Sequence, residues 1–440
     1  MVNPNKKMNS LSPIDGRYRH IVEPLQGCYS ERALNRTRLD IEWEYVKFIY
    51  PKVTNNKFEC DYVLEHSTES DGMIKQWEEK VNHDVKAVEY HLKSELFDYP
   101  ELHPWIHFGL TSQDITHTSF VLMLKRGEAL MLEKLKTFTD FLDTCVRKES
   151  ATALLSWTHG QPASPTTVGK EFNVYKHRLQ QIHSSIDALK AKLGGATGNF
   201  NAHLAAFPGI DWSFLMDEFA LSMGLHRDWL TTQVGNYDDW VTVGQEWIRR
   251  CSVLTDFCQD MRLYISRGIF SLEVKSNEVG SSTMCHKVNP IHFENAGANF
   301  KKAISDLQHF SRELPVSWCQ RDLQDSTLVR NWGVTMGHIY LGLHNVTEGL
   351  KRVKVNEKKC IEELQQHPEI LAEPIQTILR REGLTDAYET LKELTRGKKL
   401  TLVDLHTWIM DQKWSQTVKQ ECLKLKPENY VGLAIELSFI

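Results

Sequence analysis

The segment GSSTMCHKVNP, residues 280 to 290, has the residue types for chemistry and few for packing. Hydroxyl, amine and amide groups of this kind can bind anions or transfer protons. A phosphate-binding P-loop is disfavoured, because that motif needs a second glycine before its lysine and an apolar strand ahead of it. A zinc site is disfavoured because Cys285, His286 and His292 lack zinc-ligand spacing and HExxH is absent, so no metal is expected. The segment is a polar loop, and its structural alternative is a mobile surface loop.

Four further polar segments lie between apolar stretches, where binding and catalytic residues are often found. They are SPIDGRY near the start, VNHDVKAVEY from Val81, HFGLTSQDI from His107 and WTHGQPASPTTVGKEF from Trp157. Each of them, taken singly, also fits a structural role. Asp15-Gly16 fits a turn, Thr111-Ser112 a helix cap, and His159-Gly160, ahead of two prolines, the start of a helix. Chemistry is expected where these segments come together.

Long helices are the elements that must position these segments. In residues 166 to 193 the apolar positions alternate steps of four and three, which predicts one face of a single long helix. The same spacing recurs in residues 133 to 145, 247 to 265 and 336 to 353. Strand-like alternation between turn signals is hard to find. We therefore predict an all-α protein with a central long-helix bundle.

Breaks in the helical pattern predict three helical domains. The segments YPKVTNN and DYPELHPW interrupt the shorter periodic stretches near the start, and QQHPEILAEP follows the long helices. We expect an N-terminal domain over residues 1 to 112, a central bundle carrying the GSSTMCHKVNP segment over 113 to 363, and a C-terminal domain over 364 to 440.

Composition narrows the classes of function. The 440-residue chain is 41% hydrophobic and 25% charged, as ordinary folded proteins are. Its formal net charge of -5 argues against nucleic-acid binding through bulk electrostatics. The chain has no run of about 18 apolar residues, and its first residues lack the apolar core of a signal peptide. We therefore expect no membrane insertion, no export and a reducing, cytoplasmic location.

Cysteine usage agrees with a reducing compartment. Nine cysteines are scattered along the chain without a CxxC pair, which argues against a disulfide framework or a zinc knuckle. Cys251 and Cys258 are seven residues apart in an apolar helical stripe. We expect both thiols to pack in the core as small hydrophobic groups.

Seven motifs resemble those of one family, in the same order and over essentially the whole chain. They are SPIDGRY, NHDVKAVEY, TSQDI, THGQPA, GSSTM-x-HKVNP, QRDLQDSTLVRN and LAEPIQTILRR. The fifth is similar to the signature loop of the fumarase/aspartase superfamily, whose members release fumarate by cleaving C–N or C–O bonds. The joint pattern resembles the bacterial type of the adenylosuccinate lyase family, because NHDVKAVEY and QDSTLVRN are not associated with argininosuccinate lyase, fumarase or aspartase.

The resemblance implies a fumarase/aspartase-like fold and a lyase that uses no cofactor. It implies anti β-elimination of fumarate from adenylosuccinate, giving AMP, and from SAICAR, giving AICAR, in purine biosynthesis. It assigns the base to Ser281 and the acid to His159. Because serine is a weak base, Lys287 and the loop's N–H groups must stabilise its alkoxide once closure excludes water. It also implies a homotetramer in which each active site draws segments from three subunits.

The substrate implied by the resemblance carries a phosphate and two carboxylates, so local donors must bind it. Arg17, Tyr18, Arg321, Ser326 and Arg330 are expected to contact the nucleotide part. The remaining substrate-binding residues implied by the resemblance are Asn82, His83, Asp84, Thr111, Ser112, Gln233, Ser282, Val288, Asn289, Asn295, Thr327, Leu328 and Val329. His83 could orient His159 or bind phosphate, and both alternatives stay open.

Cys285 departs from the family pattern, which usually has proline at this position. Loss of proline frees φ and restores an N–H group, so we expect a less preorganised open loop and an active enzyme. If the thiol is exposed, His286 and Lys287 nearby would favour a lowered pKa and redox reactivity.

Two alternatives come from other classes of function. A catalytically silent relative would be expected to lose Ser281, His159 or Lys287, and all three are present. A sister lyase acting on argininosuccinate or a small dicarboxylate would need no site for a nucleotide phosphate.

Overall fold

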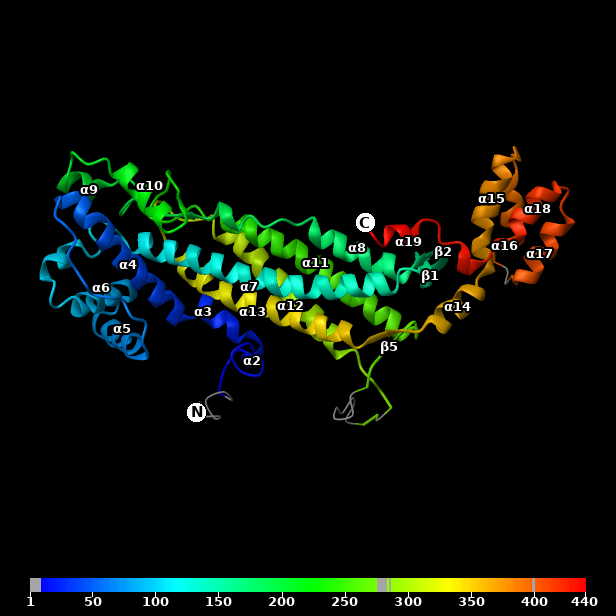
Figure 1. Ribbon diagram of the computed structural model, residues 1–440, viewed down its shortest axis with the longest axis horizontal. Coiled ribbons are helices and arrows are strands. Elements are labelled where there is room, and N and C mark those ends of the chain that lie inside the picture. Colours follow the sequence, from blue (N-terminus) through cyan, green and yellow to red (C-terminus); the bar gives the residue numbers. More distant parts are fainter. Residues whose placement is uncertain (1–8, 275–282, 285, 398–399) are drawn as a thin grey trace. The chain divides into compact units, whose positions relative to one another are not determined.

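The structure is a computed structural model that describes residues 9–274, 283–284, 286–397 and 400–440 (Figure 1). Helices dominate these residues, which confirms the all-α prediction. The α-helices are α2 Arg19–Val22, α3 Gln26–Tyr29, α4 Glu31–Thr54, α5 Thr68–Val81, α6 Asp84–Glu95, α7 Ser112–Lys148, α8 Val168–Gln180, α9 Asn201–Ala206, α10 Trp212–Ser222, α11 Asp238–Ser266, α12 Ile291–Glu313, α13 Gln324–Lys351, α14 Glu357–Gln365, α15 Ala372–Arg381, α16 Ala387–Thr395, α17 Leu402–Asp411, α18 Gln416–Leu423 and α19 Ala434–Leu437.

Short 3₁₀ helices and strands connect these helices. The 3₁₀ helices are η1 Glu23–Leu25, η2 Pro100–Trp105, η3 Ile186–Ala188, η4 Pro368–Leu371 and η5 Pro427–Asn429. The strands are β1 Ala153–Thr158, β2 Gln161–Thr167, β3 Lys190–Ala191, β4 His226–Arg227, β5 Phe270–Leu272 and β6 Val353–Val355. They form two-stranded sheets, antiparallel for β1–β2 and β5–β6 and parallel for β3–β4.

Helices α7, α11 and α13 confirm three of the predicted long helices. Their apolar stripes are buried, because every third or fourth residue returns to the same face of a helix. Cys251 and Cys258 lie on the buried face of α11, at 0% and 2% exposure, as expected from their spacing. The long helix α12 was not predicted from the sequence.

The predicted single helix over residues 166 to 193 is wrong. Helix α8 begins where the Thr167 hydroxyl accepts a hydrogen bond from the backbone N–H of Lys170, and it ends at Gln180. Beyond it, the N–H and hydroxyl of Ser185 both donate to the carboxylate of Glu246, at 3.0 and 2.5 Å. Serine side chains that bond outside the helix compete with helical backbone hydrogen bonds. The apolar spacing continues because Ile182, Leu189 and Leu193 of the irregular segment are buried too.

The chain divides into two compact units. The first unit comprises Met1–Leu135, Ile182–Ser252 and Ala298–His344, and the second comprises Lys136–Gln181, Val253–Gly297 and Asn345–Ile440. The division into three domains stays a prediction. No helix in the described part of the chain has both the length and the apolar character needed to cross a membrane.

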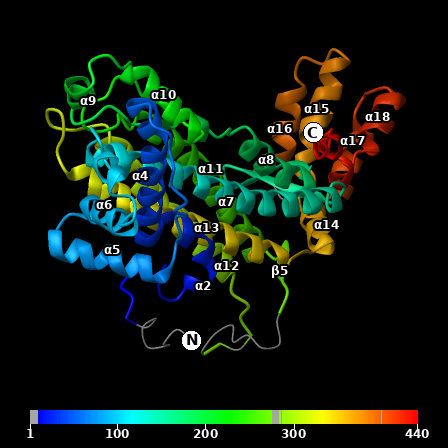
Figure 2. The same cartoon turned by 60° about the vertical axis from the view of Figure 1, so that its left-hand side comes forward.

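In the first unit, α4, α5 and α6 pack together (Figures 1 and 2) around buried residues that include Trp43, Val46, Val88 and Leu92. The bundle part of this unit has an aromatic core. Trp332 of α13 lies 5.5 Å from Trp240 of α11 and 5.6 Å from Phe310 of α12, between ring centroids.

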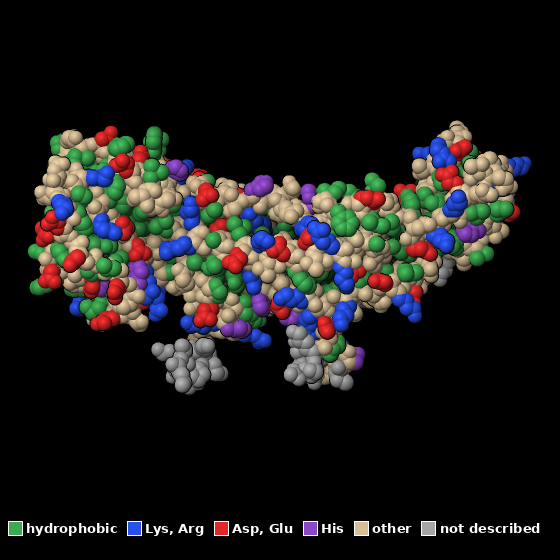
Figure 3. All heavy atoms as spheres, viewed as in Figure 1, with side chains coloured by type: hydrophobic (Ala, Val, Ile, Leu, Met, Phe, Trp, Pro, Cys, Tyr) green, Lys and Arg blue, Asp and Glu red, His purple; other side chains and the backbone are tan. Residues whose placement is uncertain are grey.

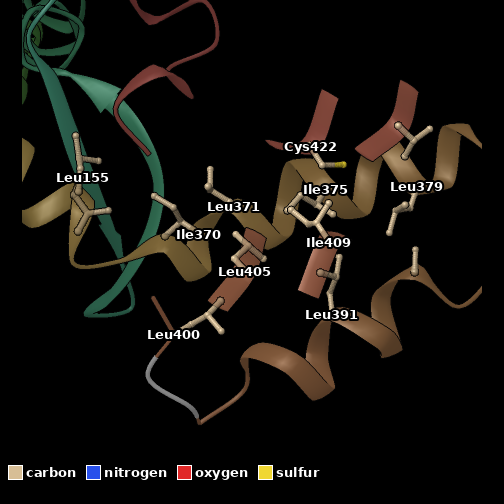
Figure 4. Packing of buried hydrophobic residues seen from close by; sticks show 13 residues of the cluster. Leu155, Ile370, Leu371, Ile375, Leu379, Leu391, Leu400, Leu405, Ile409 and Cys422 are labelled. Atoms are coloured by element: carbon tan, nitrogen blue, oxygen red, sulfur yellow. The ribbon is translucent and has the colours of Figure 1, made fainter. Parts of the chain in front are cut away.

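In the second unit, the ring of Phe257 joins α11 to its neighbours. Ring centroids lie 5.5 Å from Phe138 of α7, 6.2 Å from Phe172 of α8 and 6.3 Å from Phe293 of α12. A separate cluster of buried hydrophobic side chains lies among helices α14 to α18, and Leu155 of β1 belongs to it (Figure 4). This cluster anchors the β1–β2 hairpin to the C-terminal helices.

Two glycines test the packing of the helices. A Cβ at Gly169 in α8 would lie 2.5 Å from the Cα of Ser150, whereas a Cβ at Gly72 in α5 would meet nothing within 4 Å. We expect Gly169→Ala to lower the free energy of unfolding by about 1–3 kcal/mol through overpacking. We expect Gly72→Ala to raise it by about 0.5–1 kcal/mol, because alanine favours the helix. Denaturant unfolding measures both changes, and a loss of stability in neither variant would contradict the packing at Gly169.

Candidate active site

The starts of α6 and α7 face each other in the first unit. His83 caps α6, because its Nδ1 accepts a hydrogen bond from the backbone N–H of Lys86 at 3.2 Å. Its other ring nitrogen, Nε2, lies 3.5 Å from the hydroxyl of Ser112, the first residue of α7. Since Nδ1 accepts, the neutral ring carries its proton on Nε2. The NHDVKAVEY and TSQDI segments, far apart in sequence, therefore meet here.

Asp84 links this place to α13. Its Oδ2 accepts hydrogen bonds from Nη2 of Arg38 at 2.7 Å and from Nη2 of Arg330 at 2.8 Å. Its Oδ1 accepts from the backbone N–H of Val85 at 2.9 Å. Burial by itself would raise the pKa of Asp84, but the charges and hydrogen bonds of Arg38, Val85 and Arg330 lower it to about 2. The carboxylate is therefore ionised at neutral pH.

The first turns of α13 carry several predicted residues. Arg330 has 40% of its side chain exposed, and its Nε lies 3.5 Å from the hydroxyl of Ser326, one helical turn earlier. Thr327 is exposed and Leu328 is half-buried. Val329 is 2% exposed, so its side chain packs in the core. Ser326 and Arg330 can present a hydroxyl and a guanidinium to an anion on one face of the helix.

The other predicted residues of the first unit lie in loops and at helix ends. Asp15 of SPIDGRY and Arg330 line one cavity of about 270 Å³. Arg17 is exposed and has its guanidinium carbon 5.6 Å from the ring centre of Tyr18. Asn82 follows the last residue of α5 with a φ of 52°, and Thr111 directly precedes α7. The backbone N–H of Gln233 donates a hydrogen bond to the carbonyl of Gln320, the residue before Arg321, at 3.3 Å.

His159 lies at the tip of the β1–β2 hairpin in the second unit. Thr158 pairs with Gln161, so His159 and Gly160 are a two-residue turn, with φ values of 54° and 71°. A turn with positive φ at both residues matches the twist of a hairpin, and histidine tolerates this region better than most side chains. The structural alternative for His159-Gly160, the start of a helix, is therefore not found at this position. The imidazole is exposed in the single chain.

Side chains of the second unit hold the stem of this hairpin. Leu155 is buried next to Ile370 and Leu371 of η4 (Figure 4). Trp157 stacks under the guanidinium of Arg267, whose central carbon lies 4.5 Å from the centre of the indole ring. A rigid stem keeps the position of His159 defined although the tip is exposed.

The signature segment is described only in part. Ser281, Ser282 and Cys285 lie outside the described residues. Lys287 and Val288 are exposed, Asn289 is half-buried, and the N–H of Lys287 donates to the carbonyl of Met284 at 3.1 Å. On α12, Asn295 accepts a hydrogen bond from Asn345 at 3.0 Å. Among the described residues no hydrogen bond joins His159 to Lys287.

Charges and metal-ligating groups limit what this place can bind. On the face shown in Figure 3, Lys and Arg side chains lie among Asp and Glu side chains, so an anion must be met by local groups. No cluster of three or more His, Cys, Asp or Glu side chains able to hold a metal ion is present within the described ranges.

Comparison with known proteins identifies the family. Residues 49–303 match the family described as Lyase, and residues 317–431 match the family described as Adenylosuccinate lyase C-terminal. Curated adenylosuccinate lyases are similar to this chain over almost their whole length. The enzyme of Legionella pneumophila (strain Corby) is 38% identical over 448 residues, and that of Escherichia coli (strain K12) is 37% identical over 446 residues, with 98% of each chain covered in both comparisons. The enzyme of Dictyostelium discoideum is 39% identical over 451 residues, with 97% of each chain covered.

The chain belongs to the adenylosuccinate lyase family. It is a lyase of the fumarase/aspartase superfamily, as the sequence motifs predicted. The fold agrees with solved structures. Fumarate lyase from Mesorhizobium sp. BNC1 superimposes with a TM-score of 0.75 at 17% identity, covering 94% of this chain and 96% of that one. The 3-carboxy-cis,cis-muconate lactonizing enzyme from Pseudomonas putida superimposes with a TM-score of 0.70 at 19% identity, covering 94% and 95%.

Two residues at the site of this adenylosuccinate lyase family member were not predicted from the sequence. Asp114 and Lys192 are both fully buried, and Lys192 Nζ donates to Asp114 Oδ1 at 2.8 Å. Asp114 also accepts from the backbone N–H groups of Thr111 at 2.6 Å and Gly194 at 2.9 Å. The spacing of Thr111 and Asp114 is that of a capping box and could have indicated Asp114. Lys192 has no local signal, because its partner lies 78 residues away.

The ion pair between Asp114 and Lys192 fixes the start of α7. Burial lowers the pKa of Lys192, and the carboxylate of Asp114 opposes that shift. Lys192→Met leaves Asp114 buried without its charged partner. We expect the variant to lose about 3–5 kcal/mol in the free energy of unfolding.

Lys190→Met is the matched control, because the Lys190 side chain is 45% exposed and its Nζ lies 3.7 Å from Asp239. We expect a change within about 0.5 kcal/mol for this exposed pair. The melting temperatures of the parent, Lys192→Met and Lys190→Met, measured by thermal unfolding, test this expectation. Equal melting temperatures for Lys192→Met and the parent would contradict a structural role for the buried pair.

Proposed function

We propose that this chain catalyses the elimination of fumarate from adenylosuccinate, giving AMP, and from SAICAR, giving AICAR, in purine nucleotide biosynthesis. Family membership over the full length supports this reaction class. The observation that carries the proposal is the meeting of three segments in the first unit. His83 lies 3.5 Å from Ser112, and Asp84 joins Arg330 at 2.8 Å. The family resemblance assigns residues of these segments to substrate binding.

The nucleotide phosphate binds to Arg330, Ser326, Arg17 and Arg321 in this proposal. Arginine suits the task, because its planar guanidinium forms two parallel hydrogen bonds to a phosphate. Arg330 is already oriented by Asp84 and is 40% exposed, so its free edge can face a ligand. The same set gives a reason to prefer adenylosuccinate over argininosuccinate, which carries no phosphate.

Proton transfer in the proposal uses Ser281 and His159. The alkoxide of Ser281 takes the proton from the succinyl carbon next to a carboxylate, and the electron pair of the broken C–H bond forms the double bond of fumarate. The C–N bond breaks, and His159 donates a proton to the departing nitrogen. Lys287 stabilises the negative charge that develops on the carboxylate, together with the loop's N–H groups. No electron is gained or lost by the protein.

A homotetramer completes the proposal. The exposed imidazole of His159 needs cover from other groups before it can act as an acid in a site that excludes water. Adjacent subunits would provide that cover, with each active site drawing segments from three chains. A cytoplasmic location belongs to the same proposal, because purine nucleotide synthesis supplies its substrates there.

Fumarate release tests the function. The purified protein is expected to convert adenylosuccinate to equal amounts of fumarate and AMP and to release no fumarate from argininosuccinate. Ser281→Ala is expected to lower turnover by about 10²–10⁴-fold, as loss of a general base does. Ser252→Ala is the control, because this serine is exposed on α11 and bonds only to a carbonyl one turn earlier.

Two outcomes would contradict this proposal. Fumarate from argininosuccinate alone would show that the substrate is wrong. Normal turnover of Ser281→Ala, at the rate of Ser252→Ala, would show that another group takes the proton.

A further inference from the structure

We infer that Arg38 is a positioning residue for Arg330, acting through Asp84, and that it keeps the positive charge of Arg330 available to the phosphate of the substrate. This inference rests on the proposed function, in which Arg330 binds the nucleotide. Neither the motifs nor the family resemblance assigns a role to Arg38. Its contribution would be to nucleotide affinity rather than to proton transfer.

Arg38 is held firmly behind the site. It lies on α4 with 1% of its side chain exposed, although arginine is seldom buried to this extent. Its Nη2 donates to Asp84 Oδ2 at 2.7 Å and to the hydroxyl of Thr116 at 3.1 Å, and its Nη1 donates to the side-chain carbonyl of Asn35 at 3.2 Å. These partners fix the plane of the guanidinium, so Asp84 receives its hydrogen bond from a defined direction.

One oxygen of Asp84 serves both arginines. Oδ2 accepts from Arg38 and from Arg330, while Oδ1 accepts from the N–H of Val85. The carboxylate therefore cannot rotate without losing several hydrogen bonds at once. Because Arg330 is 40% exposed, its long side chain would otherwise sample many rotamers. The fixed carboxylate of Asp84 favours the rotamer of Arg330 in which its guanidinium lies beside Ser326.

Besides fixing the direction of Asp84, Arg38 compensates the negative charge of that carboxylate. Asp84 and Arg330 alone would form a neutral pair, and the carboxylate would repel a phosphate dianion. With Arg38 the three groups carry a net charge of one positive unit. Arg38 approaches from the buried side, so it compensates Asp84 without occupying the face of Arg330 that a ligand would use. Electrostatic binding of this kind is strongest where water is excluded.

The comparison of a single with a double substitution separates this role from simple support of the fold. Arg38→Met leaves the charge of Asp84 uncompensated, whereas Arg38→Met combined with Asp84→Asn removes both charges. If Arg38 acts by compensating Asp84, the double variant binds nucleotide better than Arg38→Met. A residue that only held helices together would not show this recovery. Arg38→Lys keeps the charge and loses part of the hydrogen bonding, so we expect a smaller effect than in Arg38→Met.

Arg36→Met is the matched control. Arg36 lies on the same helix and forms a two-bond pair with Asp71, from Nε at 3.0 Å and from Nη2 at 2.8 Å. That pair is of the same chemical type but has no link to Arg330 among the described contacts. A general cost of losing an arginine pair on α4 would therefore appear in Arg36→Met as well, although Arg36 is 30% exposed.

The experiment measures kcat and KM for adenylosuccinate, and the Kd values for AMP and for adenosine by calorimetry. For Arg38→Met we expect KM and the Kd for AMP to rise about tenfold or more, because a hydrogen bond to a charged group contributes about that factor. We expect kcat to change less than about threefold and the Kd for adenosine to stay near that of the parent, since adenosine lacks the phosphate. Arg36→Met is expected to keep the parent values.

Each other outcome overturns a distinct statement. A parent protein that releases no fumarate from adenylosuccinate overturns the proposed function. A parent that does so, with an unchanged Kd for AMP in Arg38→Met, overturns the role of Arg38. Equal losses for AMP and adenosine also overturn it, and no recovery in the double variant overturns the charge compensation of Asp84 by Arg38. If Arg38→Met does not fold, Arg38→Lys decides the question: a Kd for AMP that rises while the Kd for adenosine stays near the parent value supports the role, and a Kd for AMP equal to that of the parent overturns it.

Discussion

Two carboxylates with restricted access to water organise the first unit, Asp114 with none of its side chain exposed and Asp84 with 31% exposed, because such groups need charged or N–H partners. Asp114 satisfies this requirement with Lys192 and with backbone N–H groups from two separate segments, and so fixes the start of α7. Asp84 does the same at the start of α6 by bonding Arg38 and Arg330. Since each partner comes from a different part of the chain, satisfying two carboxylates brings candidate substrate-binding segments together. Stability and site geometry thus have the same physical origin here.

In the second unit, the β1–β2 hairpin carries the exposed imidazole of His159 at its tip, and packing of the hairpin stem supports it. The tip of the β1–β2 hairpin needs positive φ at His159 and Gly160, and such backbone is held only when the strands on either side are fixed. Leu155 ties β1 to the C-terminal helices through apolar packing, and Trp157 is held by Arg267. The C-terminal cluster (Figure 4) therefore has a functional consequence, because it keeps the proposed acid from moving with an unsupported loop.

The sequence predicted much of the fold, because apolar periodicity reports which face of a helix is buried. The helices α7, α11 and α13 follow from this rule. It failed beyond Gln180, where an irregular segment keeps the same spacing of buried side chains while Ser185 bonds to Glu246. Family motifs pointed to the candidate site residues. They could not indicate Arg38 or Lys192, because the partners of these residues lie 46 and 78 positions away and no local pattern marks them.

We propose that the proton-transfer groups of one active site come from different copies of the chain. Mixing two inactive proteins, Ser281→Ala and His159→Gln, tests it most directly. After gentle unfolding and reassociation in equal amounts, about a quarter of the sites would combine an intact Ser281 from one copy with an intact His159 from another, by random assortment in a closed oligomer. We expect recovery of about that fraction of the parent turnover, with an unchanged KM. Mixed oligomers that contain both variants and stay as inactive as either protein alone would contradict it.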